Sequence, residues 1–125
     1  MNSFYFMLTK IRERPALYLE KVSLIALDNF WAGYEQRDMI ETWQQKTGKN
    51  YFKNYDEASR INVKKLYDNK PYFMDGFDEF VHSHYDHKMS TTHGIGLISQ
   101  KSNSDEEAFH TFFKLLDEFL KQKGV

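Results

Sequence analysis

Histidines form the clearest candidate in this chain for catalysis or metal binding. Residues 82–87 read His-Ser-His-Tyr-Asp-His, which places three imidazoles and one carboxylate close together. Imidazole nitrogens and carboxylate oxygens are ordinary ligands of zinc and similar metals. A metal ion held there could activate a water molecule for hydrolysis. The four donors of this candidate metal site are His82, His84, Asp86 and His87.

The spacing H-x-H-x-D-H resembles the metal-binding motif of hydrolases with the metallo-β-lactamase fold. In that family the motif follows a buried strand inside a sandwich of sheets and helices. Here residues 73–81 have apolar positions at helical spacing, and 125 residues are too few for that sandwich. We therefore keep a metal-dependent hydrolase as the alternative function and predict no metal or other cofactor. The preferred interpretation is a polar helix end with surface histidines.

Other candidates for catalysis lack partners in the sequence. Ser90, Thr91 and Thr92 precede His93, but no carboxylate is placed to orient that histidine, as a catalytic triad requires. The chain contains no cysteine, so thiolate nucleophiles and thiolate metal sites are excluded. We predict that the protein is not an enzyme.

Helices are the elements predicted to position these residues. Apolar residues recur at i, i+3, i+4 and i+7 over residues 4–11, and this helix is predicted to stop at Pro15. Ser23 is predicted to cap a second helix that ends near Gly48. Arg37 and Asp38 interrupt its apolar stripe, so we expect a bend there.

The second half of the chain follows the same pattern. After a loop at 49–55, one partly exposed helix is predicted from Asp56 to Leu66, and another from Pro71 to His84. Residues 94–98 could form a helix or a strand.

The last predicted helix is the clearest. It begins with a capping box formed by Ser104 and Glu107, and its wide apolar face indicates a central position. The chain contains 11 Phe, 8 Tyr and 2 Trp. We predict a single all-α domain over residues 1–125, a compact bundle of about five to six helices with an aromatic core.

Charge and composition restrict the location and the partners. The net charge is −1, with 12 Lys/Arg against 9 Asp/Glu in residues 1–70 and 5 against 9 in residues 71–125. Because the overall charge is negative, we expect no direct nucleic-acid binding. No signal peptide or membrane span is predicted. The absence of cysteine fits a reducing compartment, so we expect a cytoplasmic protein.

Two segments carry a family resemblance. Residues 11–19 read Ile-Arg-Glu-Arg-Pro-Ala-Leu-Tyr-Leu, and residues 108–119 read Ala-Phe-His-Thr-Phe-Phe-Lys-Leu-Leu-Asp-Glu-Phe. With Phe30, Gly33 and Tyr34 between them, they resemble a group of small bacterial proteins, some of which look like immunity proteins encoded beside polymorphic or contact-dependent toxins. The resemblance spans most of the chain and leaves a divergent middle at about 37–70. It implies a non-catalytic protein that neutralises a cognate toxin domain, many such toxins being nucleases.

An acidic face bearing aromatic residues would fit the basic cleft of such a nuclease. The candidate partner-binding residues are Tyr72, Asp75, Asp78, Glu79, Tyr85, Asp86, Asp105 and Glu106.

A second candidate surface consists of aromatic residues in or near predicted loops. Its members are Tyr51, Phe52, Tyr55, Tyr67 and Tyr72, which could contact a partner or pack the loops onto the core. An intracellular adaptor is a further alternative that the sequence does not separate from a toxin-binding protein.

Overall fold

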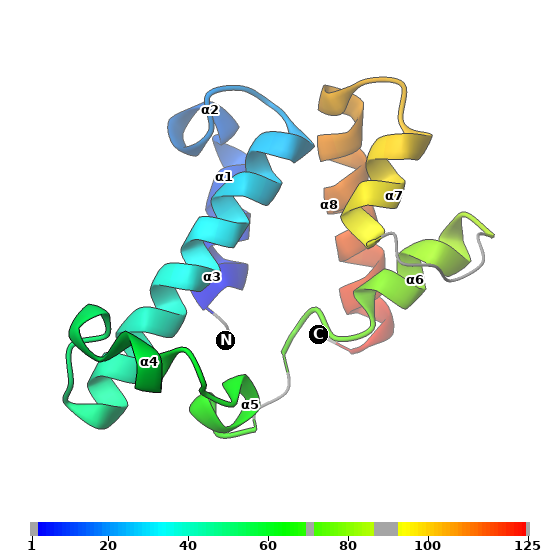
Figure 1. Ribbon diagram of the computed structural model, residues 1–125. Coiled ribbons are helices and arrows are strands. Elements are labelled where there is room, and N and C mark those ends of the chain that lie inside the picture. The colour runs from blue at the N-terminus through cyan, green and yellow to red at the C-terminus, as the bar shows by residue number, and fades with distance from the viewer. Residues whose placement is uncertain (1–2, 70–71, 87–92, 125) are drawn as a thin grey trace. The chain divides into compact units, whose positions relative to one another are not determined.

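The regular elements of this protein are helices. The computed structural model describes residues 3–69, 72–86 and 93–124, and within them it contains eight α-helices, one 3₁₀ helix and no strand (Figure 1). In chain order they are α1 Ser3–Glu13, α2 Pro15–Tyr18, α3 Leu24–Thr47, η1 Phe52–Asn54, α4 Tyr55–Ala58, α5 Val63–Leu66, α6 Phe77–His84, α7 Gly94–Lys101 and α8 Asp105–Gln122. The predicted all-α fold with an aromatic core is confirmed, with a slightly higher helix count than expected. No helix in these described ranges is both long and apolar enough to cross a membrane.

The chain divides into two compact units, each described by itself. Unit 1 consists of Met1–Phe30 and Phe73–Val125, and unit 2 is Trp31–Tyr72. Helix α3 begins in unit 1 and continues into unit 2.

The first helix ends where the sequence predicted. Helix α1 stops at Glu13, two residues before Pro15. Pro15 then begins α2, a single helical turn that the sequence did not predict, because proline is tolerated at the first helical position. The guanidinium of Arg12 in α1 binds the carboxylate of Asp117 in α8 at 2.6 Å and ties the two helices of unit 1 together. This ion pair raises the pKa of Arg12.

Helix α3 begins after Ser23 and is longer than an average helix. The Ser23 hydroxyl accepts a hydrogen bond from the Ala26 amide at 3.0 Å, as expected of an N-cap. The helix continues through Arg37 and Asp38 to Thr47. It ends before Gly48, whose φ of +71° suits glycine.

The core of unit 1 forms where α6, α7 and α8 meet. Helix α6 begins at Phe77, later than predicted, because Gly76 with φ +91° turns the chain just before it; Pro71 lies outside the described residues. The ring of Phe77 packs edge-on against Phe112 at 5.6 Å and Phe119 at 5.5 Å.

Helices α7 and α8 complete that core. Residues 94–98, left open between helix and strand, belong to α7. The capping box of α8 is confirmed on one side, because Ser104 Oγ accepts from the Glu107 amide at 3.0 Å. The apolar face of α8 is buried as predicted, with Phe109 and Phe112 almost inaccessible to solvent.

Unit 2 has a smaller core of its own. Trp43, Tyr51, Ala58 and Leu66 are buried together, with partly buried residues packed against them. Residues 49–66 form three short helices, η1, α4 and α5, where a loop and one helix were predicted. Asn62 separates the last two, since its side chain accepts a hydrogen bond from the Lys65 amide and caps α5.

Candidate functional site

The histidines of the candidate metal site do not share an environment. His82 is 1% exposed in α6, and its Nδ1 lies 2.7 Å from the carbonyl oxygen of Asp78. His84 ends the same helix with its side chain exposed, and Asp86 is exposed beyond it. His87 lies outside the described residues. Among the described residues, no three His, Cys, Asp or Glu side chains are placed to hold one metal ion.

The expectation of surface histidines is therefore wrong for His82. Its position lies beside Val81 and five residues after Phe77, and these three residues make up the buried face of α6. The physical reason is that the ring packs inward and binds a carbonyl one turn earlier, which satisfies one polar atom of a buried imidazole.

Asp78 lies near His93, which the sequence did not predict. Its Oδ1 accepts a hydrogen bond from the Gly94 amide at 2.8 Å, and its Oδ2 lies 3.6 Å from His93 Nδ1. The fold brings this carboxylate to His93 from the preceding helix, a contact between residues 15 positions apart that local spacing does not reveal. A Cβ on Gly94 would lie 2.8 Å from Asp78 Oδ1, so this close approach depends on glycine.

This pair caps a helix rather than orienting a buried base. His93 is 87% exposed, and Asp78 binds the first amide of α7. A carboxylate in that position satisfies a free helical amide and interacts favourably with the helix dipole. Ser90, Thr91 and Thr92 lie outside the described residues.

Asp105, one of the predicted partner-binding residues, is occupied within unit 1. Its carboxylate accepts hydrogen bonds from the Ser23 hydroxyl and from the amides of Leu24 at 3.1 Å and Ile25 at 3.2 Å. These amides are the first of α3, so a residue of α8 supports the N-terminus of a helix that lies early in the chain.

The other predicted partner-binding residues are spread over the molecule. Tyr72 belongs to unit 2. The Asp75 carbonyl accepts from Lys123 Nζ at 3.0 Å, beyond the C-terminal end of α8, whereas Glu106 lies in the first turn of that helix. An 18-residue helix spans roughly 27 Å. Asp75 and Glu106 therefore belong to opposite ends of unit 1's longest helix, and Asp78 and Glu79 lie on α6.

One local grouping of the predicted residues does form. Tyr85 is half-buried, and burial together with the nearby Glu107 carboxylate raises the pKa of its phenol. Tyr85 at the end of α6 therefore lies near Glu107 in the first turn of α8. Asp86 and Glu106 are the chain neighbours of these two residues, and both are exposed.

The loop aromatics of unit 2 divide into two kinds. Tyr67 and Tyr72 turn their hydroxyl groups to carboxylates of α3: Tyr67 donates to Asp38 at 2.8 Å, and Tyr72 donates to Glu35 at 2.9 Å. Burial, followed by the hydrogen bond to Asp38, raises the pKa of Tyr67 to about 12. These two tyrosines are engaged within their own unit.

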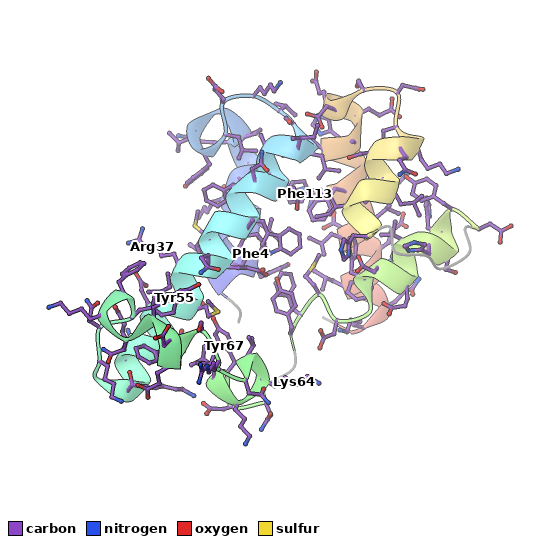
Figure 2. All side chains as sticks on the ribbon, in the orientation of Figure 1. Phe4, Arg37, Tyr55, Lys64, Tyr67 and Phe113 are labelled. Atoms are coloured by element: carbon purple, nitrogen blue, oxygen red, sulfur yellow. The ribbon has the colours of Figure 1, made fainter. Side chains whose placement is uncertain are left out.

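Phe52 and Tyr55 are exposed on a fixed support. Phe52 is 71% exposed and Tyr55 is 56% exposed, whereas Tyr51 between them and the core is 5% exposed. The Tyr51 ring lies edge-on to both, at 5.3 Å from Phe52 and 5.8 Å from Tyr55, and to Trp43 at 5.9 Å. A buried ring therefore supports two rings that face solvent. We call Phe52 and Tyr55 the aromatic pair; Figure 2 labels Tyr55 on its short helix.

Hydrogen bonds fix the backbone beneath the aromatic pair. Asn50 Oδ1 accepts from the Lys53 amide at 2.9 Å, and Gln44 Oε1 accepts from the Tyr51 amide at 3.0 Å. Lys49 Nζ lies 3.0 Å from both carboxylate oxygens of Glu57. The pair therefore needs little ordering before it contacts a partner.

The surface around the pair is an open, shallow depression. It is lined by Phe52, Lys53, Asn54, Tyr55, Asp56 and Glu57. No protein-family model, curated protein or solved structure matches the chain. The aromatic pair is the candidate functional site that the geometry favours, and the sequence signal for it was a cluster of aromatics among polar residues.

Proposed function

We propose that this protein is a non-catalytic, cytoplasmic binding protein that neutralises a cognate bacterial toxin domain by direct contact, as immunity proteins do. The observation that carries the proposal is the aromatic pair, held in a solvent-facing position by the buried Tyr51. Exposed aromatic side chains on a rigid support are typical anchors of protein interfaces, because they supply contact area at little entropic cost.

Two further observations support a binding role. The segments at 11–34 and 108–119 resemble a group of small bacterial proteins, some of which look like immunity proteins. The described residues of the histidine motif differ in environment, with His82 buried and His84 exposed. Binding alone therefore accounts for the features described so far, without a chemical step.

Co-expression with the neighbouring gene tests this function. The polypeptide encoded beside this gene is expressed from an inducible promoter with and without this protein, and colony formation is counted. We expect the neighbour to arrest growth alone and this protein to restore growth. A harmless neighbour, or a toxic one that this protein fails to counter, overturns the proposal.

A second measurement separates binding from enzymatic inactivation. The complex is purified, dissociated in denaturant, and the toxin is refolded alone. We expect an unchanged toxin mass and full recovery of toxicity, since binding leaves no covalent mark. A changed mass or a permanently inactive toxin would show that this protein acts as an enzyme.

A further inference from the structure

The carboxylates of unit 2 are almost all engaged within that unit. Five of its six carboxylates interact with described side chains, and only Asp56 makes no such contact. Glu35 accepts from Trp31 and Tyr72, Asp38 accepts from Tyr67, and Glu41, Glu57 and Asp68 pair with Arg37, Lys49 and Lys46.

The cations of the same unit are not balanced in this way. Lys53, Arg60, Lys64 and Lys65 are exposed, and none of them forms an ion pair with another residue in the described ranges. Glu35 and Asp38 accept from neutral indole and phenol groups and keep their charge, so the surplus is a local one. Residues 52–65 contain four cations and two carboxylates, and this segment therefore carries more positive than negative charge.

These cations alternate with exposed apolar side chains along one segment. Between residues 52 and 65, Phe52 is 71% exposed, Tyr55 is 56% exposed and Val63 is 52% exposed. Buried Ala58 and the Asn62 cap hold the segment in place. Figure 2 labels Tyr55 on α4 and Lys64 on α5, the two short helices of this segment.

We propose that residues 52–65 are the docking surface for an acidic surface of a protein partner. This inference rests on the proposed function and names the chemistry of the partner's contact region. Exposed apolar side chains interspersed along the segment with unpaired cations match a partner surface that presents both apolar and acidic groups. The proposal assigns the interface to unit 2, whereas the acidic residues that the sequence suggested belong to unit 1.

A protein fits this segment better than a nucleic acid does. The carboxylates of Asp56 and Glu57 line the same depression as the aromatic pair, so this surface carries both signs of charge, whereas nucleic-acid interfaces are much more positively charged than protein–protein interfaces. Val63 adds aliphatic area that a base does not need for stacking.

The test uses poly-L-glutamate as an acidic polypeptide probe. The full-length, ¹⁵N-labelled protein is titrated with it, and amide shifts are followed by NMR. We expect the largest shifts in residues 52–65. Changing Arg60, Lys64 and Lys65 together to Gln should weaken binding by about tenfold, since each exposed pair contributes a fraction of a kcal/mol.

A matched variant controls for charge alone. Lys101, Lys114 and Lys121 are exposed lysines of unit 1, and changing them to Gln removes the same charge. We expect their loss to change affinity by less than about twofold, because these lysines do not belong to the proposed docking surface and salt screens charges outside it. Equal losses in both variants, or shifts scattered over both units, overturn the proposal. Tighter binding of oligo(dT) by residues 52–65 also overturns it, in favour of a nucleic acid.

The toxin assay keeps this inference separate from the proposed function. If wild-type protein restores growth, the Arg60, Lys64 and Lys65 variant should lose rescue while the unit 1 variant keeps it. If the unit 1 variant loses rescue instead, the docking surface is rejected and the proposed function still stands. If wild-type protein does not restore growth, the proposed function fails, and the titration still decides whether residues 52–65 bind an acidic polypeptide.

Discussion

Asp105 is a charged residue whose role lies in the structure of unit 1. One carboxylate receives the Ser23 hydroxyl and two backbone amides of α3. Its neighbour Glu106 has the same charge and an exposed side chain. Of these two adjacent acidic residues, Asp105 therefore caps a helix and Glu106 faces the solvent.

Replacing Asp105 by Ala should therefore destabilise the protein. The loss of the carboxylate leaves two helix-terminal amides and a buried hydroxyl with fewer partners, which costs about 1–2 kcal/mol. Urea denaturation measures the change. Glu106→Ala is the control, because it removes an equal charge from the first turn of α8, and it should cost under about 0.5 kcal/mol. Similar losses in both variants would contradict the assigned role.

We expect the contribution of Tyr67 to the stability of unit 2 to fall at alkaline pH. The pKa of its phenol is raised from 10.0 to about 12, so the unfolded chain releases the proton first. Stability from this group is fully present below pH 10 and is lost as the pH rises toward about 12. Tyr67→Phe should cost about 1 kcal/mol at neutral pH.

The difference between wild-type protein and Tyr67→Phe should then shrink between pH 10 and 12. Urea titrations across this range measure it. Tyr55→Phe serves as the control, since Tyr55 is 56% exposed, and it should change stability little at any pH. A constant difference between wild-type protein and Tyr67→Phe would show that burial and the hydrogen bond to Asp38 do not raise the pKa of the phenol.

At the scale of elements, two glycines have opposite effects on helices. Gly76 precedes α6 with φ +91°, and the nearest atom to a Cβ there is 3.7 Å away in the Phe119 ring. Space is therefore sufficient, and the cost of a side chain comes from the backbone. Gly33 lies inside α3, where a Cβ would meet nothing within 4 Å.

We expect Gly76→Ala to destabilise the protein by about 1–2 kcal/mol, because a left-handed conformation disfavours a Cβ. Gly33→Ala should stabilise it by about 0.5–1 kcal/mol through helix propensity. Thermal or urea denaturation of both variants provides the measurement. The two changes should have opposite signs, and a stabilising Gly76→Ala would refute the backbone argument.

Long helices with strong apolar faces could be predicted from the sequence, and short ones could not. Helix α8 has eight buried residues at helical spacing and a local cap, so its signals lie within a few residues of each other. Helix α2 has four residues, none of them buried, and therefore carries no periodic pattern. Helices α4 and α5 have four residues each and bury only one of them, so neither shows a recognisable apolar face.

The candidate site was predictable only as a class of residue. Aromatics in a polar segment marked residues 51–55 as a possible surface, but which ring is buried depends on contact with Trp43 in another helix. The roles of Asp105 and Asp78 depend on partners 82 and 16 residues away. Contacts over such distances are set by tertiary packing, which local spacing does not encode.

At the scale of the whole molecule, we expect the residues that bind the partner to contribute little to the stability of the fold. Phe52→Ala with Tyr55→Ala removes rings that are mostly in solvent, so stability should change by less than about 1 kcal/mol. Affinity for the toxin should fall by about a hundredfold or more if both rings are anchors. Calorimetric titration measures the affinity, and circular dichroism checks the fold.

The control for the aromatic pair comes from unit 1. Leu17 is 67% exposed on α2, and Leu17→Ala should leave affinity and rescue unchanged. If this change weakens binding as much as the loss of the pair does, the interface includes α2 and the assignment to unit 2 is incorrect.

Both tryptophans of the chain, Trp31 and Trp43, belong to unit 2. Trp43 is buried against Tyr51, the ring that supports Phe52 and Tyr55. Light at the long-wavelength end of the protein's ultraviolet absorption band excites tryptophan selectively. It therefore excites unit 2, and the phenylalanine-rich helices of unit 1 do not contribute to the emission. Emission from the unmodified protein can thus report events in residues 31–72 without an attached dye.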